Sequence, residues 1–162
     1  MPNLESNVKR WENKKKKAQL QTMAAGMVFI GLLSGIVGNM TAMFTFSPSF
    51  PLLKLSILAV GVLIFLFVSL SSWTNYSFLY HYFSSQWVHK SRPDELQLLT
   101  GTLEYMDHVH MPYAGVFKRI QLRLKNEEVV TLYVKPTIMK GIKTSETVRV
   151  RSYHLFVVDV YR

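Results

Sequence analysis

Two long apolar stretches fill the first half of the chain and predict a pair of membrane-spanning helices. Met23–Phe46 comes first, and Leu52–Leu70 follows with Lys54 as its only charge. An apolar helix of about 20 residues, rising 1.5 Å per residue, matches a hydrocarbon layer of about 30 Å. Pro48 and Pro51 break the helix between the stretches, and so short a connection makes the two helices antiparallel neighbours. Residues 23–72 are therefore predicted to form a transmembrane hairpin.

Residues 73–93 continue the second apolar stretch with an aromatic stripe. Its members recur every three or four positions, as on one helix face: Trp73, Tyr76, Tyr80, Phe83 and Trp87. Aromatic rings at the end of a span prefer the headgroup layer. We expect an amphipathic helix from about Ser71 to His89, bent into the membrane interface or packed on the C-terminal domain. Pro93 disfavours helix at the residue before it and closes the segment.

Small residues gather on one side of the first span and predict close helix packing. Gly31 and Gly35 form a GxxxG motif, and Ser34 and Gly38 repeat the spacing of small residues. Without bulky side chains there, another helix gains packing contacts that lipid does not match. The partner of this helix-packing face is the second span, a second copy of the chain or a different membrane protein.

From Asp94 onward the pattern changes from helical to period two, which is typical of half-buried strands. Apolar and polar residues alternate in five short runs, at 98–106, 116–125, 128–135, 146–152 and 154–161. Asn126-Glu127 suits a tight hairpin, and Pro136–Gly141 suits a single helical or 3₁₀ turn. Residues 94–162 are therefore expected to form a small all-β domain, an OB-like or SH3-like five-stranded barrel.

Charge sets the expected orientation of the hairpin. The net charge is +9 over 162 residues. Residues 1–22 carry six Lys or Arg against two Glu, with four consecutive lysines at Lys14, Lys15, Lys16 and Lys17. Basic flanks remain on the cytoplasmic side, so this tail and the barrel are predicted to face the cytoplasm of a cell whose inner membrane holds the hairpin. The lysines and the aromatic stripe are the predicted membrane-interface residues.

Chemistry-bearing residues are sparse. The chain has no cysteine, which excludes disulfides and thiolate sites. His108 and His110, spaced as alternate residues of a strand, suggest a metal site with Asp107, yet a hairpin loop at residues 107–115 leaves this set incomplete. We therefore expect neither cofactor nor metal, and no catalytic set is recognisable. The loop still predicts a partner-binding surface, with His108, His110, Met111 and Tyr113 as candidates.

The layout resembles bacterial NfeD-like membrane proteins, which combine a membrane hairpin with a C-terminal barrel. The local similarity lies in Val130–Val134, in Val148-Arg149-Val150 and in Leu155–Val160, and Thr100–Leu103 corresponds to the opening strand. Ser145-Glu146 stands where that family has a glycine turn. The resemblance implies a non-catalytic partner of membrane scaffold or protease proteins.

Two functions from different classes follow. The first is a non-enzymatic, membrane-anchored adaptor or accessory subunit whose barrel binds another membrane protein, or a second copy of itself. The second is a membrane-tethered sensor that binds a ligand or metal through residues 107–115. Nucleic acid is disfavoured as a partner because residues 93–162 carry ten Lys or Arg against eight Asp or Glu.

Overall fold

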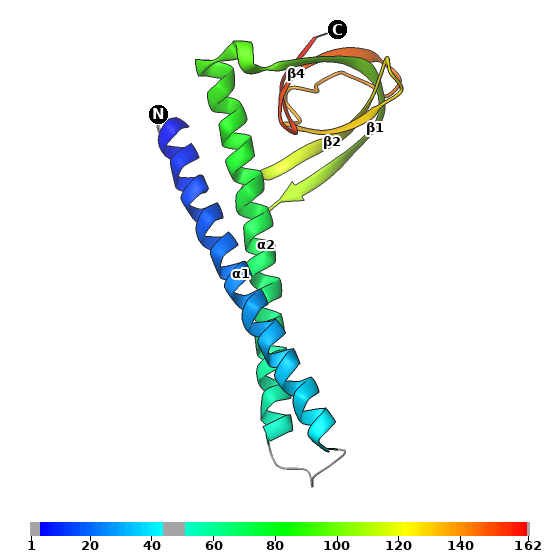
Figure 1. The fold of residues 1–162 in the computed structure, drawn as a ribbon. Helices are drawn as coiled ribbons and strands as arrows, with labels where there is room; N and C mark the ends of the chain where they lie inside the picture. The colour runs from blue at the N-terminus through cyan, green and yellow to red at the C-terminus, as the bar shows by residue number, and fades with distance from the viewer. Residues whose placement is uncertain (1–3, 44–50, 162) are drawn as a thin grey trace. The chain divides into compact units, whose positions relative to one another are not determined.

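The computed structural model describes residues 4–43 and 51–161, as two long helices followed by five strands (Figure 1). Residues 44–50, where the turn between the spans is predicted, lie outside the described part. The elements are α1 (Leu4–Met43), α2 (Pro51–Ser91), the 3₁₀ turn η1 (Pro93–Glu95), β1 (Gln97–Met111), β2 (Gly115–Leu124), β3 (Val129–Val134), β4 (Thr147–Tyr153) and β5 (Phe156–Tyr161). They form two compact units: the hairpin unit, Asn13–Tyr76, and the barrel unit, which combines the chain up to Glu12 with the chain from Ser77 onward.

In the hairpin unit, α1 and α2 meet through small side chains. Ala18, Ala25 and Ala59 are buried, as is Ser69. A methyl group added at Gly26 would lie 3.9 Å from Leu66 Cδ1 of the facing helix. Small residues allow two helix backbones to approach closely, which is the usual way in which helices pack inside a bilayer.

Many of the other apolar side chains of the hairpin unit are exposed. Met27 is 67% exposed and Phe67 is 73% exposed. Only 6% and 11% of the most apolar segments of the two helices are buried. Both helices are long and apolar enough to cross a membrane, and a lipid environment would remove the unfavourable contact of these side chains with water.

The helices extend further into the polar flanks than the sequence pattern suggests. α1 begins at Leu4, so the described part of the basic segment is helical and continuous with the first span. α2 runs without interruption from Pro51 to Ser91, so the amphipathic continuation predicted from about Ser71 to His89 belongs to the same helix. Neither proline nor glycine occurs between Gly61 and Ser91, so no residue there favours a break.

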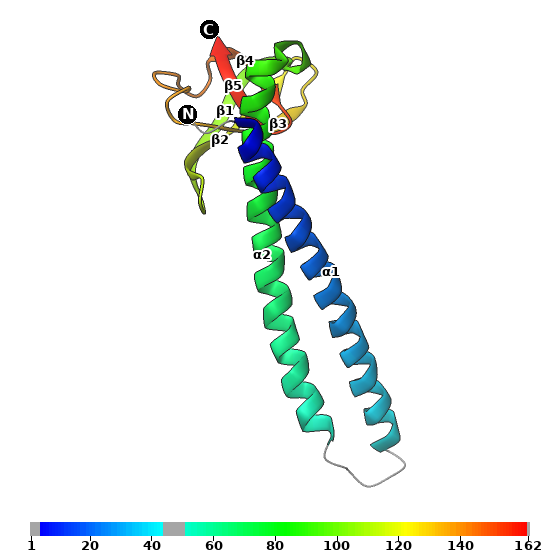
Figure 2. The same cartoon turned by 90° about the vertical axis from the view of Figure 1, so that its left-hand side faces the viewer.

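The barrel unit is closed in the order β1-β2-β3-β5-β4. Figures 1 and 2 show two views of this barrel. All neighbours are antiparallel except β3 and β5, which pair in parallel at Tyr133 and Phe156. This order, with its one parallel contact, is that of an OB-like barrel and decides between the two expected barrel types.

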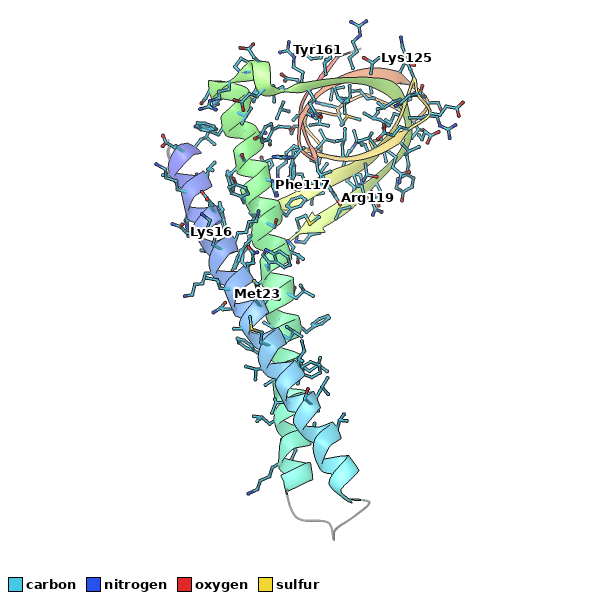
Figure 3. The ribbon with its side chains drawn as sticks, viewed as in Figure 1. Lys16, Met23, Phe117, Arg119, Lys125 and Tyr161 are labelled. Atoms are coloured by element: carbon cyan, nitrogen blue, oxygen red, sulfur yellow. The ribbon has the colours of Figure 1, made fainter. Side chains whose placement is uncertain are left out.

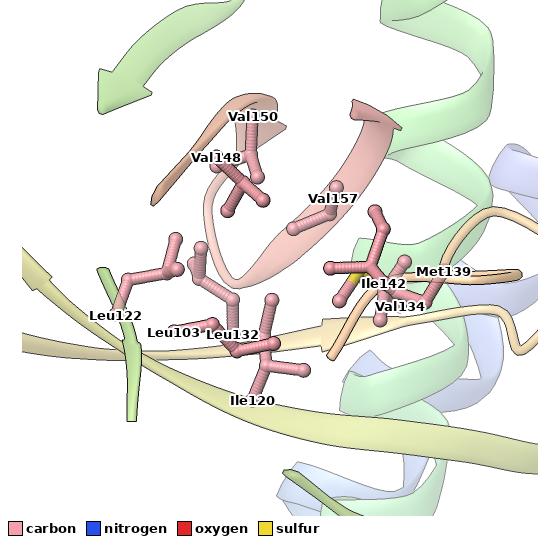
Figure 4. Close-up of a cluster of buried hydrophobic side chains, with 10 residues drawn as sticks. All are labelled: Leu103, Ile120, Leu122, Leu132, Val134, Met139, Ile142, Val148, Val150 and Val157. Atoms are coloured by element: carbon pink, nitrogen blue, oxygen red, sulfur yellow. The ribbon is translucent and has the colours of Figure 1, made fainter. Parts of the chain in front are cut away.

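The barrel interior is filled by apolar residues of the strands together with Met139 and Ile142 of the β3–β4 connection (Figure 4). β4 shows the alternation most clearly, with Val148 and Val150 buried between exposed Arg149 and Arg151. The cluster consists of Leu103, Ile120, Leu122, Leu132, Val134, Met139, Ile142, Val148, Val150 and Val157. Five strands form at the predicted runs. β5 departs from period two, because Phe156, Val157 and Val158 are all buried.

Most turns form at the residues for which the sequence predicts them. Glu127 in the β2–β3 turn has φ 64°, and its N–H donates to Leu124 O at 3.0 Å. Ser145, at the position where the resembling family has glycine, adopts φ 70° and thus the left-handed conformation that glycine favours. Pro136–Gly141 forms successive hydrogen-bonded turns in place of a helical turn.

The expectation of a loop from Asp107 is wrong. Strand β1 continues to Met111, and Met111 pairs with Gly115. Only Pro112, Tyr113 and Ala114 separate the two strands. The alternation of His108, Val109 and His110 is itself a strand pattern, and pairing with β2 satisfies the backbone groups on one side of the strand.

Gly101 provides a test of how closely β1 and β2 pack. A Cβ at this position would lie 2.5 Å from Arg123 O, a backbone atom that does not move without disturbing the β1–β2 pairing. We expect Gly101→Ala to destabilise the protein by about 1–3 kcal/mol, as overpacking does, measured by chemical unfolding of the full chain in detergent. Thr100→Ala, one residue away, is the control and should cost clearly less; equal costs would contradict the steric explanation.

Candidate functional site

A cluster of aromatic rings joins the C-terminal part of α2 to the outside of the barrel. Within the barrel unit, the Phe78 ring lies 5.2 Å from Phe117 on β2, 5.3 Å from Tyr133 on β3 and 4.8 Å from Phe156 on β5. Tyr82, one helical turn later, lies 5.1 Å from Phe117. We call these five residues the aromatic seam. Edge-to-face packing of this kind adds to the gain from burying the rings.

The aromatic seam occupies the barrel face that OB-like proteins use for ligands. Phe117, labelled in Figure 3, is fully buried, and Phe156 is 2% exposed. Outward-facing aromatics on the second and third strands are what such barrels use to stack bases. In this chain Phe117 and Tyr133 already pack against α2. Any partner of the barrel would therefore have to contact another part of its surface.

The paired ends of β1 and β2 extend beyond the rest of the barrel, visible in Figures 1 and 2. β4 pairs with β1 only through Gln97–Thr102, whereas β2 pairs with β1 up to Met111. We call residues 104–118 the overhanging hairpin. At its tip, Tyr113 is 79% exposed and has φ 64°, and Gly115 has φ 81°. Val116, beside the tip, is 44% exposed.

Lys135 braces this hairpin from the end of β3. Its ammonium donates to Ala114 O at 2.7 Å and lies 4.0 Å from the centre of the Phe117 ring. Partial burial lowers the pKa of Lys135, because desolvation disfavours the charged form. The lysine therefore ties the tip of the hairpin to the aromatic seam and holds the tip in a defined position.

Ion pairs neutralise much of the charge on the hairpin. Arg119 donates two hydrogen bonds to the carboxylate of Asp107, from Nε at 3.1 Å and from Nη2 at 2.6 Å. Its guanidinium carbon lies 6.0 Å from the centre of the Tyr105 ring. The hydrogen bond from Arg119 holds the pKa of Asp107 below its usual value. Arg123 pairs with Glu104 at 2.6 Å. Tyrosine and paired arginine at a half-exposed surface are typical of protein interfaces.

Four of the five histidines lie in two places, and the fifth, His89, lies near Asp159. His108 and His110 are exposed on β1, whereas His154, in the β4–β5 turn, packs on His81 of α2 at 5.0 Å. Asp107 precedes His108 on the strand, but its carboxylate accepts a hydrogen bond from Arg119. Within residues 4–43 and 51–161, no group of three or more His, Cys, Asp or Glu is positioned to hold a metal ion.

The predicted interface residues lie in both units. In the hairpin unit, Lys14 Nζ is 5.6 Å from the centre of the Tyr76 ring. In the barrel unit, Phe83 stacks on Trp11 at 6.3 Å and Arg92 lies 5.4 Å from the Trp87 ring. Tyr80 contacts His81 at 5.1 Å. Their position in a headgroup layer stays a prediction, as does that of Lys15, Lys16, Lys17 and Trp73.

The predicted helix-packing glycines do not face α2 closely. A methyl group added at Gly31, Gly35 or Gly38 would meet no described atom within 4 Å, whereas one at Gly26 would meet Leu66. Ser34 hydrogen-bonds Ile30 O of its own helix. Packing of this face against a further helix stays a prediction.

The sequence analysis misses Phe78 and Tyr82 of the aromatic seam, and also Lys135, which contacts the hairpin tip. Phe78, Tyr82, Ser85 and His89 also follow helical spacing, but the longer stripe beginning at Trp73 marks the neighbouring face more strongly. Ser85 is fully buried, and His89 Nδ1 lies 3.7 Å from Asp159 Oδ2 of β5. This second stripe is the signal that could have identified the barrel-facing side of α2.

The aromatic seam should be measurable as a coupling between helix and barrel. Phe117→Ala should destabilise the barrel unit by about 3–5 kcal/mol, and a double-mutant cycle with Phe78→Ala should show about 0.5–1.5 kcal/mol of coupling. Chemical unfolding of the full chain in detergent gives both values. A cycle of Phe78→Ala with Tyr161→Ala is the control; equal coupling in both cycles would contradict a specific contact.

The brace should be visible in hydrogen exchange. Lys135→Met removes a charge-assisted hydrogen bond, of a kind worth about 1.5–3 kcal/mol, so amides at the hairpin tip should exchange about tenfold faster or more. Lys125→Met, at the exposed β2–β3 turn, is the matched control and should leave the tip unchanged. Unaltered exchange at residues 111–116 in Lys135→Met would show that the brace is unimportant.

Comparison with known proteins does not assign the chain to a family. No family model matches the chain, and no curated protein or solved structure is significantly similar to it. The architecture that the NfeD resemblance implies, two long apolar helices followed by a five-stranded mixed barrel, is present.

Proposed function

We propose that this protein is a non-catalytic, membrane-anchored adaptor whose barrel binds another membrane protein through the overhanging hairpin. The observation that carries the proposal is the hairpin itself: a braced tip that presents Tyr113 at 79% exposure. Buried tyrosines are among the residues that contribute most to interface affinity. A tip held in place by Lys135 would lose little conformational entropy when a partner covers it.

The edge of β1 supports the same proposal. Among the strand pairings of the described residues, β1 beyond Leu103 pairs on one side only. An extended segment of a partner can add to such an edge through main-chain hydrogen bonds, while neighbouring side chains select its sequence. The hairpin offers Tyr105, His108 and His110 for this selection.

The membrane placement in this proposal has the hairpin unit crossing the inner membrane and the barrel in the cytoplasm. It is supported by the length and exposure of the two apolar helices and by the lysines at one end of α1. Basic residues resist translocation, so the end that carries Lys14–Lys17 remains in the cytoplasm. The barrel follows α2 and shares that side.

Membership of the NfeD-like family is part of the proposal only as a fold analogy, which does not carry function. The sensor alternative uses the same hairpin, with exposed His108 and His110 as ligands. It requires a third ligand from outside the described residues or from a bound molecule. Metal content of the intact protein, compared with a His108→Ala/His110→Ala variant, separates the two functions.

The test is site-specific photo-crosslinking of the full chain in intact cells. A photoreactive residue at Tyr113 should yield an adduct with another membrane protein, and the same residue at Asn126, at the opposite end of β2, should not. The captured protein should also co-purify with the wild type and fall by about fivefold or more with Tyr113→Ser, the effect of losing an interface hot spot. Adducts with lipid or with a second copy alone, or equal yields at both positions, would overturn the proposal.

A further inference from the structure

A hollow lies between the two helices of the hairpin unit. Its volume is about 270 Å³, and it is lined by Lys14, Lys17, Ala18, Gln21 and Tyr76. The four α1 residues recur at the spacing of one helix face, and Tyr76 faces them from α2. Ala18, 2% exposed, forms the floor, and its short side chain leaves the space that the longer side chains surround.

The side chains around the hollow suit a phosphate group. Two ammonium groups, an amide and a phenolic hydroxyl are all hydrogen-bond donors, and two of them are positively charged. No Asp or Glu occurs between Asn13 and Pro93, so the hairpin unit contains no acidic side chain that would repel a phosphate. Glu12 precedes Lys15 and Lys16 by one helical turn, the spacing of helical ion pairs, and these two lysines do not line the hollow.

The hollow lies at the polar end of both apolar stretches. On α1, Gln21 comes two residues before Met23, where the first apolar stretch begins, and on α2, Tyr76 follows Leu70, where the second ends. Met23, labelled in Figure 3, is 53% exposed. Other apolar side chains further along α1 are exposed too. A ligand in the hollow would therefore have its phosphate beside the lysines and an acyl chain along the apolar surface of α1.

We propose that this hollow binds the phosphate of an anionic phospholipid from the surrounding membrane. The proposal rests on the membrane placement above and is independent of the adaptor role, because its test measures lipid and no protein partner. Lys14 and Lys17 contact the phosphate, and Tyr76 and Gln21 donate further hydrogen bonds. Lys15 and Lys16 contribute to the general positive potential only, which attracts anionic lipid without selecting a position.

The test is native mass spectrometry of the full-length protein in detergent with added phosphatidylglycerol or phosphatidylcholine of equal acyl chains. The wild type should retain phosphatidylglycerol preferentially. Lys14→Gln/Lys17→Gln should weaken this binding by about tenfold or more, since each basic residue near an anionic lipid surface contributes about fivefold. Lys15→Gln/Lys16→Gln removes the same charge from the same lysine run and should retain most of the binding.

Three results would overturn the proposal. Equal losses in both double variants would mean diffuse attraction, and equal retention of the two lipids would mean no recognition of an anionic headgroup. Displacement of the lipid by inorganic phosphate at the same concentration would make free phosphate the ligand. Circular dichroism of both variants checks that the helices are intact.

Discussion

Burial of aromatic rings between α2 and the barrel is the contact on which the barrel unit depends. The chain from Pro93 onward is short, and a domain of that size buries too little apolar surface to be very stable alone. Phe117 and Phe156 are outside the barrel interior and would be exposed without α2. Phe78 and Tyr82 bury them, so the helix serves as a further layer of the barrel's core as well as a link to the hairpin unit.

This contact also limits what the barrel can bind. Where an OB-like barrel elsewhere presents aromatics to a ligand, the rings here face Phe78. A single-stranded nucleic acid would have to displace α2 before it could stack on Phe117 or Tyr133. The basic residues beside them are also engaged, because Arg119 and Arg123 pair with Asp107 and Glu104. The same charge pairing is compatible with a protein partner, whose own surface is of mixed charge.

Local patterns in the sequence predict most of the fold, because strand alternation and helix hydrophobicity are local properties. Val148 and Val150 are buried because every second residue of a strand faces the same way. Contacts between distant segments leave weaker signals. Nothing near Lys135 indicates that its ammonium reaches Ala114, and the residues that face the barrel from α2 compete with a longer aromatic stripe on the same helix. The overhanging hairpin resembles a loop in sequence because Pro112 and Gly115 are turn residues, although the strand pairing extends to Met111 and Gly115.

An exposed strand edge is normally a risk of aggregation, and the overhanging hairpin shows how this chain limits that risk. Half of the residues of β1 beyond Leu103 are polar or charged, namely Glu104, Asp107, His108 and His110. The strand also carries an irregularity between Leu103 and Tyr105. Such a bulge increases local twist and makes pairing with an arbitrary flat strand less favourable. A partner strand with a matching twist, a polar surface and a pocket for Tyr113 would pair with this edge without the unfavourable distortion that a flat strand would need. The features that keep the edge soluble are therefore the ones that would make its binding selective.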